Sequence, residues 1–397
     1  MDKIRDIEIY ILGGRDTPDQ WASASIIIRV LTDDGEAGYG EAIPTRRVNQ
    51  VVKALEEIRE LARGKEIYAL PKLYWEWYKH EYYLPFSIES VSAYSAIDIA
   101  VYDLLGKKHG MPAYIMLGGL AREKIKVYAN GWYRDCVSPE CFAEKAKKVV
   151  SMGFKALKFD PFGPYFDVID RRGLDEAVER VRAVREAVGR YVDLLIEFHG
   201  RFNIASAISA IRELEQFDPL FYEEPIHPEK NLEGLRRLRT VTSRRIALGE
   251  RILFPEDAER LLREGLVDVL QPDITNCLGF TGITRIRAIA EIYSAELAPH
   301  NAFGPIQHAA TIQFDASTNN LLIQESFYEF WPEWKRKLIK DPFKIEDGNH
   351  LLPRRPGLGI YVEDSVLHEF RIPEARTQYS EEPVWVVKNT WRSYTEK

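Results

Sequence analysis

The sequence predicts an α/β protein built around a modified TIM barrel, (β/α)7β, with an N-terminal α+β capping domain that the C-terminal tail completes. The main observation is a series of apolar runs that each end at an ionisable residue: Glu197, Glu223, Glu250, Asp273, His300 and Glu325. The successive intervals are 26, 27, 23, 27 and 25 residues, and one strand plus one helix has about this length. The strands of such a barrel end on one face, so the six polar groups are expected to converge.

Residues 1–120 are predicted to form the capping domain. Three β-rich segments separated by turns, Asp6–Leu12, Ala22–Leu31 and Gly38–Ala42, indicate a small antiparallel sheet. Apolar residues then recur with helical spacing over Asn49–Ala62 and Ser87–Lys108. This part of the chain therefore does not alternate strands with helices.

Residues 121–326 are predicted to form the barrel. Eight expected strands, the number that closes a barrel, begin at Ile125, Phe154, Leu194, Phe221, Ile246, Val267, Glu296 and Leu321. The intervening segments have helical patterns: Pro139–Met152, Leu174–Val188, Ile204–Gln216, Leu232–Thr240, Pro255–Glu264, Gly282–Tyr293 and Ile306–Phe314.

Residues 327–397 form a separate C-terminal segment. Phe327–Lys340 is too short and aromatic for a clear eighth barrel helix, and Gly357–Val362 has the pattern of another strand. We expect this segment to return to the N-terminal sheet. The aromatic stretch Pro383–Trp391 could pack on another subunit or on the same chain, and the sequence favours neither.

The composition excludes several classes of protein. The chain has 397 residues, 45% hydrophobic and 29% charged, and no apolar run approaches the ~20 residues of a membrane span. The charged start, Met1–Asp6, has no signal-peptide core, which favours a cytoplasmic protein. A net charge of −7 argues against nucleic acid as a partner. Cys136, Cys141 and Cys277 lack metal-site spacing and are interpreted as reduced thiols without a role.

Glu197, Glu223 and Glu250 end three consecutive predicted strands. Placing three carboxylates together would cost several kcal/mol through repulsion and desolvation, and a cation removes that cost. Mg²⁺ prefers carboxylate ligands and keeps positions for water and substrate oxygens. We therefore expect these residues to bind one Mg²⁺ per subunit.

Asp273 and His300 end the next two strands, where the carboxylate could hold the imidazole and raise its basicity. This is the arrangement of a general base. Lys158 ends the second strand and would place a cation beside the metal, where it could hold a substrate carboxylate. Lys155 has the opposite alternation and could simply be solvated.

The order and spacing of these motifs resembles the enolase superfamily, in its mandelate-racemase-like group, and is most similar to its acid-sugar dehydratases. The matching motifs span nearly the whole chain: residues 114–119, Lys158-Phe159-Asp160-Pro161, Glu197-Phe198-His199-Gly200-Arg201, Glu223-Glu224-Pro225, Gly249-Glu250-Arg251, Gln271-Pro272-Asp273, Pro299-His300 and Gln324-Glu325. Each motif is weak alone, but the ordered set is specific.

The resemblance implies a role for each position. Glu197, Glu223 and Glu250 would be the metal ligands, and His300 with Asp273 the base that removes the proton α to the carboxylate. His199, expected on the same strand face as Glu197, would protonate the departing 3-hydroxyl. Glu325 would hydrogen-bond to the ene-diolate, and Lys158 would add positive charge to it. Asp160, Arg201 and Arg15 are assigned to substrate binding.

The chain departs from the family pattern at two positions. The first ligand is commonly Asp but here is Glu197, one methylene longer. In the racemase pattern Lys-x-Lys the second Lys is a base on the opposite side of the substrate, and Asp160 stands in its place. Elimination needs one base and one acid, which His300 and His199 supply.

These observations predict Mg²⁺-dependent dehydration of a sugar acid, an aldonate such as gluconate, galactonate or a pentonate, to the 2-keto-3-deoxy acid. The alternatives are a racemase or epimerase of an α-hydroxy acid, and a non-catalytic barrel used for binding or assembly. Substrate identity would depend on the loops at 15–21, 44–47 and 82–86. The resemblance also suggests a homo-oligomer, from dimer to octamer.

Overall fold

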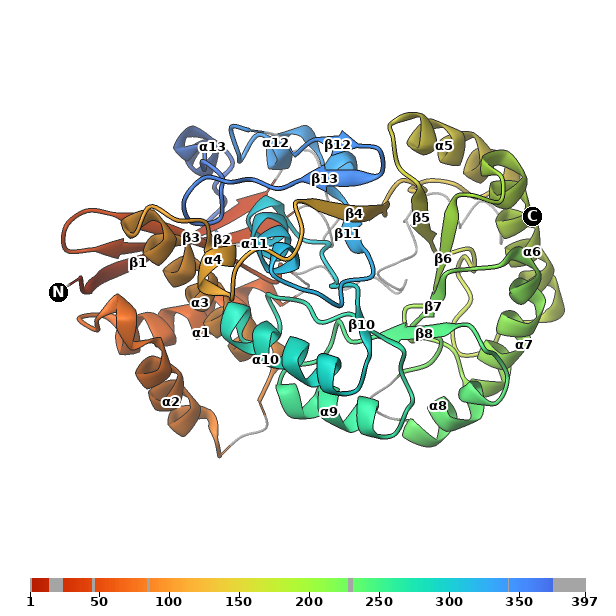
Figure 1. The fold of residues 1–397 in the computed structure, drawn as a ribbon, viewed down its shortest axis with the longest axis horizontal. Coiled ribbons are helices and arrows are strands. Elements are labelled where there is room, and N and C mark those ends of the chain that lie inside the picture. Colours follow the sequence, from red (N-terminus) through yellow and green to blue (C-terminus); the bar gives the residue numbers. More distant parts are fainter. Residues whose placement is uncertain are drawn as a thin grey trace.

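A computed structural model of the chain describes residues 2–13, 24–44, 47–83, 86–227, 231–341 and 343–373. Within these residues an N-terminal α+β part lies beside a barrel of parallel strands surrounded by helices (Figure 1). The predicted fold class is confirmed. No helix in the described part of the chain combines the length and the apolar character needed to cross a membrane.

The N-terminal part contains an antiparallel sheet of β1 (Ile4–Gly13), β2 (Ala24–Thr32) and β3 (Ala37–Ala42), in that order. It packs on α3 (Ile88–Lys108), whose small and branched residues are buried along most of the helix. Two further helices, α1 (Val48–Ala62) and α2 (Leu70–Glu81), complete this part, with a short 3₁₀ turn, η1 (Ile67–Ala69), between them. The sequence patterns did not predict α2, because its many aromatic residues obscure the helical period.

Eight parallel strands form the barrel: β4 (Lys124–Ala129), β5 (Ala156–Phe159), β6 (Asp193–Glu197), β7 (Phe221–Glu223), β8 (Arg245–Leu248), β9 (Val269–Leu270), β10 (Glu296–Leu297) and β11 (Gln324–Ser326). Strands β4 to β10 pair in chain order, and β11 pairs with β4. The barrel closes because Leu297 of β10 forms a parallel bridge with Leu321, just before β11.

Seven longer helices follow β4 to β10 in turn: α5 (Pro139–Ser151), α6 (Arg171–Val188), α7 (Ile204–Leu214), α8 (Leu232–Arg239), α9 (Pro255–Arg263), α10 (Gly279–Ile292) and α11 (Pro305–Ala316). A short 3₁₀ turn, η2 (Glu215–Phe217), extends α7. Four of these helices begin at a side chain that accepts a hydrogen bond from the backbone three residues later: Ser138, Asp170, Asn203 and Asn231. A four-residue helix, α4 (Ala113–Met116), precedes the barrel.

The C-terminal segment crosses back to the N-terminal sheet, as predicted. After η4 (Tyr328–Phe330) and α12 (Glu333–Arg336), the hairpin of β12 (Ile345–Glu346) and β13 (Asn349–Leu351) pairs with β4. Helix α13 (Asp364–Glu369) follows, and the next residues bond to β1: Ile372 donates its N–H to the carbonyl of Ile11. In Figure 1, α13 lies next to this sheet.

Two sequence predictions are wrong. Residues 357–362 form a turn rather than a strand, because Gly357 and Gly359 adopt φ values of 68° and 79° that interrupt an extended chain. Cys136 and Cys141 are joined in a disulfide rather than reduced, since the loop after β4 and the first turn of α5 bring their Cα atoms to 5.4 Å. Cys277 is buried and unbridged.

The interior of the barrel has an apolar layer of eight buried residues, one on or directly beside each strand: Tyr128, Ala156, Leu195, Phe221, Ala247, Val269, Ala298 and Ile323. A separate core fills the space between the strands and the surrounding helices. Because side chains alternate along a strand, the residue two positions further on faces the interior again, one layer nearer the carboxyl ends.

Candidate active site

The layer above the apolar one is almost entirely polar. Two residues beyond each apolar position lie Asn130, Lys158, Glu197, Glu223, Gly249, Gln271, His300 and Glu325. Seven of these eight side chains are polar or charged, and all seven are buried. Alternation along the strands therefore brings Lys158 and three of the predicted carboxylates into one ring at the barrel mouth, and His300 joins this ring from just beyond the end of β10.

Lys158 lies among three carboxylates of this ring. Its ammonium Nζ contacts Glu223, and it lies 2.8 Å from Glu325 Oε1 and 3.2 Å from Glu197 Oε2. Although burial lowers the pKa of Lys158, the surrounding carboxylates raise it well above its ordinary value, so the side chain is a cation. Lys155 instead lies on the surface, paired with Asp347, as its alternation indicated.

Glu197 and Glu223 are opposite each other on β6 and β7, close enough for one carboxyl group to donate a hydrogen bond to the other when it is protonated. Burial, together with the neighbouring charge of Glu197, raises the pKa of Glu223 well above the ordinary value. Gln271 donates from Nε2 to Glu223 Oε2 at 2.6 Å. Two such carboxylates would repel each other if both were ionised without a further cation.

Glu250 enters the site from the turn after β8 rather than from the strand. The preceding residue, Gly249, has a φ of 143°, and a Cβ there would lie 2.9 Å from the backbone N of Gln271. Burial raises the pKa of Glu250, but Arg251, His300 and His199 outweigh this effect and lower it to about 2. Glu250 is therefore ionised and lies within electrostatic reach of both predicted catalytic histidines.

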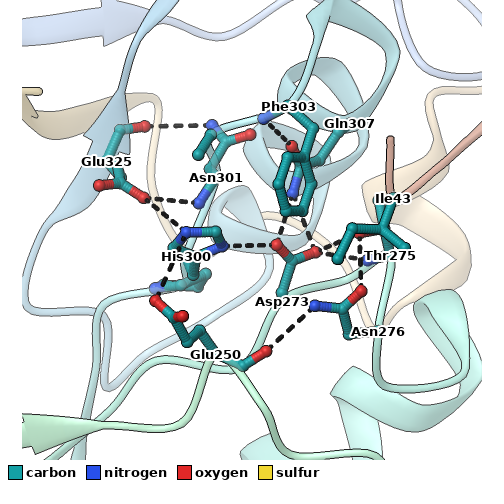
Figure 2. A network of polar contacts seen from close by, with 12 residues as sticks. Ile43, Glu250, Asp273, Thr275, Asn276, His300, Asn301, Phe303, Gln307 and Glu325 are labelled. Carbon is teal, nitrogen blue, oxygen red and sulfur yellow. Dashed lines mark hydrogen bonds and ion pairs between the residues drawn. The ribbon is translucent and has the colours of Figure 1, made fainter. Parts of the chain in front are cut away.

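Asp273 and His300 form the predicted pair. His300 Nδ1 lies 2.6 Å from Asp273 Oδ2, while Nε2 lies 3.6 Å from Glu250 Oε2 and 3.9 Å from Glu325 Oε2 (Figure 2). Burial lowers the pKa of His300, yet Glu250, Glu325 and Asp273 raise it to about 10. The nitrogen that could exchange a proton with a ligand is thus Nε2.

Glu325 on β11 is held by three donors. Its Oε1 accepts from Asn130 at 2.8 Å and from Lys158, and its Oε2 accepts from the backbone N–H of Asn301 at 2.8 Å. Burial raises the pKa of Glu325, but Lys158 and His300 lower it overall. The carboxylate is therefore an acceptor in this arrangement.

His199 reaches the site by a different route from the one predicted. Strand β6 ends at Glu197, so strand alternation does not place His199. The residue lies in a left-handed turn with a φ of 55°, and its backbone N–H donates to Glu197 Oε1 at 2.6 Å. Its ring Nδ1 lies 2.8 Å from Asp160 Oδ2.

Asp160 and Arg201 form a bidentate pair behind His199. Arg201 Nη1 lies 2.5 Å from Asp160 Oδ2, and Nη2 lies 2.9 Å from Oδ1. Burial raises the pKa of Asp160, but the Arg201 guanidinium and the His199 hydrogen bond hold it well below its usual range. Arg15, the third predicted substrate-binding residue, lies outside the described residues.

Sequence reasoning missed several polar neighbours of these residues. Asn130 and Gln271 occupy ring positions but are uncharged, so only strand alternation could have identified them. Glu224 follows Glu223 in a left-handed conformation and contacts Arg251, while burial and Glu250 raise its pKa to about 7. Gln307 lies on α11 and carried no sequence signal.

The donor set fits a hard divalent cation in its chemistry. The carboxylates of Glu197, Glu223 and Glu250 could supply oxygen ligands. Burial and the neighbouring charge of Glu197 raise the pKa of Glu223, and a bound cation would oppose both effects. In the described part of the chain, no three acidic, His or Cys side chains already surround a common metal position. A cation bound by these residues would share the carboxylates of Glu197 and Glu223 with Lys158.

Comparison with known proteins identifies the family. Residues 141–366 match the model described as enolase C-terminal domain-like, and residues 19–118 match that of the mandelate racemase / muconate lactonizing enzyme N-terminal domain. The chain is 47% identical over 392 residues to the D-gluconate dehydratase of Thermoproteus tenax, covering 99% of this chain and 79% of that protein.

It is also 40% identical over 393 residues to the D-gluconate/D-galactonate dehydratase of Picrophilus torridus, covering 99% and 100% of the two chains. Among solved structures, mandelate racemase/muconate lactonizing enzyme from Jannaschia sp. CCS1 superposes with a TM-score of 0.86 at 29% identity, covering 94% of this chain and 99% of that one. The chain therefore belongs to the enolase superfamily, in the mandelate racemase/muconate lactonizing enzyme group.

Proposed function

We propose that the protein is a hydro-lyase, a Mg²⁺-dependent sugar-acid dehydratase that converts an aldonate such as gluconate, galactonate or a pentonate into its 2-keto-3-deoxy acid. The names of the relatives from Thermoproteus tenax and Picrophilus torridus support a sugar acid as the substrate class. The structural observation that carries the proposal is the presence of two separately oriented imidazoles, His300 on Asp273 and His199 on Asp160, around one ring of carboxylates.

In this proposal His300 is the base. Asp273 engages Nδ1, so Nε2 removes the proton α to the substrate carboxylate and leaves an ene-diolate. His199 donates a proton to the 3-hydroxyl, which leaves as water when the C3–O bond breaks. The resulting enol gains a proton at C3 and releases the proton of its 2-hydroxyl to solvent, which gives the 2-keto-3-deoxy acid. Lys158 contributes positive charge beside the ene-diolate. Glu325, held as an acceptor, shares a hydrogen bond by accepting from the 2-hydroxyl of the ene-diolate.

We assign Glu197, Glu223 and Glu250 as ligands of one Mg²⁺ per subunit. When bound, the ion would supply charge that stabilises the ene-diolate and would offset the charge of Glu250, which contributes to the raised pKa of His300. The side chains of Asp160 and Arg201 are satisfied by each other and by His199. We therefore assign them to holding His199, and retain Arg15 as a predicted substrate-binding residue.

We also propose the domain division 1–120, 121–326 and 327–397, and assembly as a homo-oligomer of two to eight subunits. Light scattering on the eluate of a sizing column would measure the assembly directly. A monomer at micromolar concentration would contradict that part of the proposal.

A screen of aldonates tests the activity. The protein is incubated with each sugar acid and Mg²⁺, and 2-keto acid formation is measured, with EDTA-treated protein and the Glu223→Gln variant as controls. We expect turnover of at least one aldonate, abolished by either control. Full activity without metal would remove the metal assignment, and inversion at C2 without elimination from any aldonate would favour the racemase alternative.

A further inference from the structure

Asp273 has hydrogen-bond donors other than His300. Its Oδ1 accepts from the backbone N–H of Thr275 at 2.7 Å and from the Thr275 hydroxyl at 2.6 Å. Nε2 of Gln307 lies 2.9 Å from Oδ1 and 2.8 Å from Oδ2, so it bridges the two carboxylate oxygens. Figure 2 shows Asp273 between His300 and Thr275, with Gln307 reaching it from α11.

The orientation of the Gln307 amide is determined by its own partner. The backbone N–H of Phe303 donates to Gln307 Oε1 at 2.7 Å. A flipped amide would place its oxygen against the Asp273 carboxylate and its NH₂ group against this N–H, losing hydrogen bonds at both ends. The side chain is completely buried, so water cannot replace them. Gln307 therefore presents a fixed donor to Asp273.

The N-terminal part of the chain holds the helix that carries Gln307. Oε2 of Glu41, on β3, accepts from the backbone N–H of Ile306 at 3.1 Å and of Gln307 at 3.0 Å, at the first turn of α11. This carboxylate lies so close to the helix start that a Cβ on Gly304 would be 1.9 Å from Glu41 Oε1. Buried Lys335 donates to the Phe303 carbonyl at 2.8 Å.

We propose that Gln307 is a positioning residue for His300, and that Glu41 ties this positioning to the N-terminal sheet. The inference rests on the proposed function, because it concerns the base of that reaction. Thr275 and Gln307 orient the Asp273 carboxylate, and Asp273 orients the imidazole through Nδ1. Being neutral, Gln307 holds the carboxylate without competing with the imidazolium that forms when His300 takes the α-proton.

Gln307→Leu tests the proposal, with Gln313→Leu as a matched control. Gln313 lies six residues further along α11, is equally buried, and bonds to Tyr114, Pro353 and Leu358 rather than to the site. Each variant loses the hydrogen bonds of one buried side-chain amide on α11. Only Gln307→Leu should lower kcat, by about 10- to 100-fold, with KM changed by less than about 2-fold.

The isotope effect separates positioning from a general loss of structure. With a C2-deuterated aldonate, Gln307→Leu should show a larger primary isotope effect on kcat than the unmodified enzyme or Gln313→Leu, because a misplaced base slows proton abstraction. Glu41→Leu should change the isotope effect in the same direction. An unchanged isotope effect in folded Glu41→Leu would refute the link to the N-terminal sheet.

A readout without turnover keeps the two proposals distinguishable. The Nδ1–H proton of His300, hydrogen-bonded to Asp273, should give a downfield ¹H signal that disappears in His300→Asn and shifts in Gln307→Leu but not in Gln313→Leu. If the unmodified protein turns over no aldonate, the proposed function fails whatever this signal shows. If it does turn over an aldonate, and Gln307→Leu retains kcat, isotope effect and signal, the positioning role is refuted.

Discussion

Replacing Lys158 with Met removes an ammonium that contacts three buried carboxylates. At 3.2 Å, the separation from Glu197 Oε2, the attraction between unit charges is about 5 kcal/mol at an effective dielectric constant of ~20. The desolvation of the charges offsets much of this in the native protein. Breaking a buried ion pair by removing one partner nevertheless costs about 3–5 kcal/mol, because the remaining charges are uncompensated. We expect a loss of this size in the free energy of unfolding.

Urea denaturation in EDTA at pH 8, followed by tryptophan fluorescence, measures this loss. Titrating Mg²⁺ into the same assay tests the metal assignment independently of activity. If Glu197, Glu223 and Glu250 bind Mg²⁺, the ion should stabilise Lys158→Met more than the unmodified protein, because it replaces the missing charge. An ion at 100 times its Kd contributes about 2.7 kcal/mol, which is large enough to resolve.

Lys335→Met is the matched control. Lys335 is also fully buried, but its Nζ donates to the carbonyls of Ala24 and Phe303, away from the three glutamates. It should be destabilised without any extra response to Mg²⁺. Stability of Lys158→Met within about 1 kcal/mol of the unmodified protein in EDTA would refute the charge argument. An equal Mg²⁺ response in all three proteins would refute sharing of the carboxylates between Lys158 and the ion.

Three further predictions address other parts of the molecule. His300→Asn should lower both α-proton exchange in D₂O and product formation by about 10²-fold or more, whereas His199→Asn should lose product formation while exchange persists. Undiminished dehydration by His199→Asn would exclude His199 as the acid. Cys136→Ser should lower the free energy of unfolding by about 2 kcal/mol, which is the entropic contribution expected from closing so short a loop. Alkylation of the denatured, unmodified protein should modify one thiol before reduction and three after it. Burial lowers the pKa of His350 to about 4, so as the pH falls from about 6.5 this residue takes up a proton in the unfolded chain before it does so in the folded protein. The free energy of unfolding should therefore fall by about 1.4 kcal/mol per pH unit, and His350→Gln should lack this contribution. Parallel pH profiles of the variant and the unmodified protein would refute this.

Much of the site follows from one regularity of the sequence. Apolar runs that end in ionisable residues at intervals of 23–27 residues predict the barrel and the convergence of Glu197, Glu223, Glu250, Asp273, His300 and Glu325. Lys158 is predicted separately, from its place at the end of the second strand. This worked because the side-chain period of a strand is strict, so an interior apolar position dictates the next interior position two residues later. Charged residues at those positions stand out against the buried strand that precedes them.

The features that differ from the prediction or were missed lie where this regularity ends. The sequence predicts His199 and Glu250 as site residues, but their placement depends on left-handed turns beyond the strand ends that charge patterns do not reveal. Gln307 lies on a helix, where one amide among buried residues has no distinctive spacing. The bond between Cys136 and Cys141 depends on how a loop meets a helix start, which the count of cysteines does not determine.

Asp160 provides the strongest structural argument for elimination over racemisation. In the racemase pattern its position carries a lysine that acts as a second base, and a base must accept a proton near neutral pH. Both oxygens of Asp160 instead accept hydrogen bonds from Arg201, Oδ1 also accepts from the backbone N–H of Phe162, and Oδ2 contacts His199. These partners outweigh burial and hold the pKa of Asp160 well below its usual range, so the carboxylate has little affinity for a proton. The position that would hold a second base thus orients the imidazole of His199. In the proposed mechanism, with His300 as the base and His199 as the oriented acid, this arrangement favours removal of a proton and loss of a hydroxyl group over racemisation.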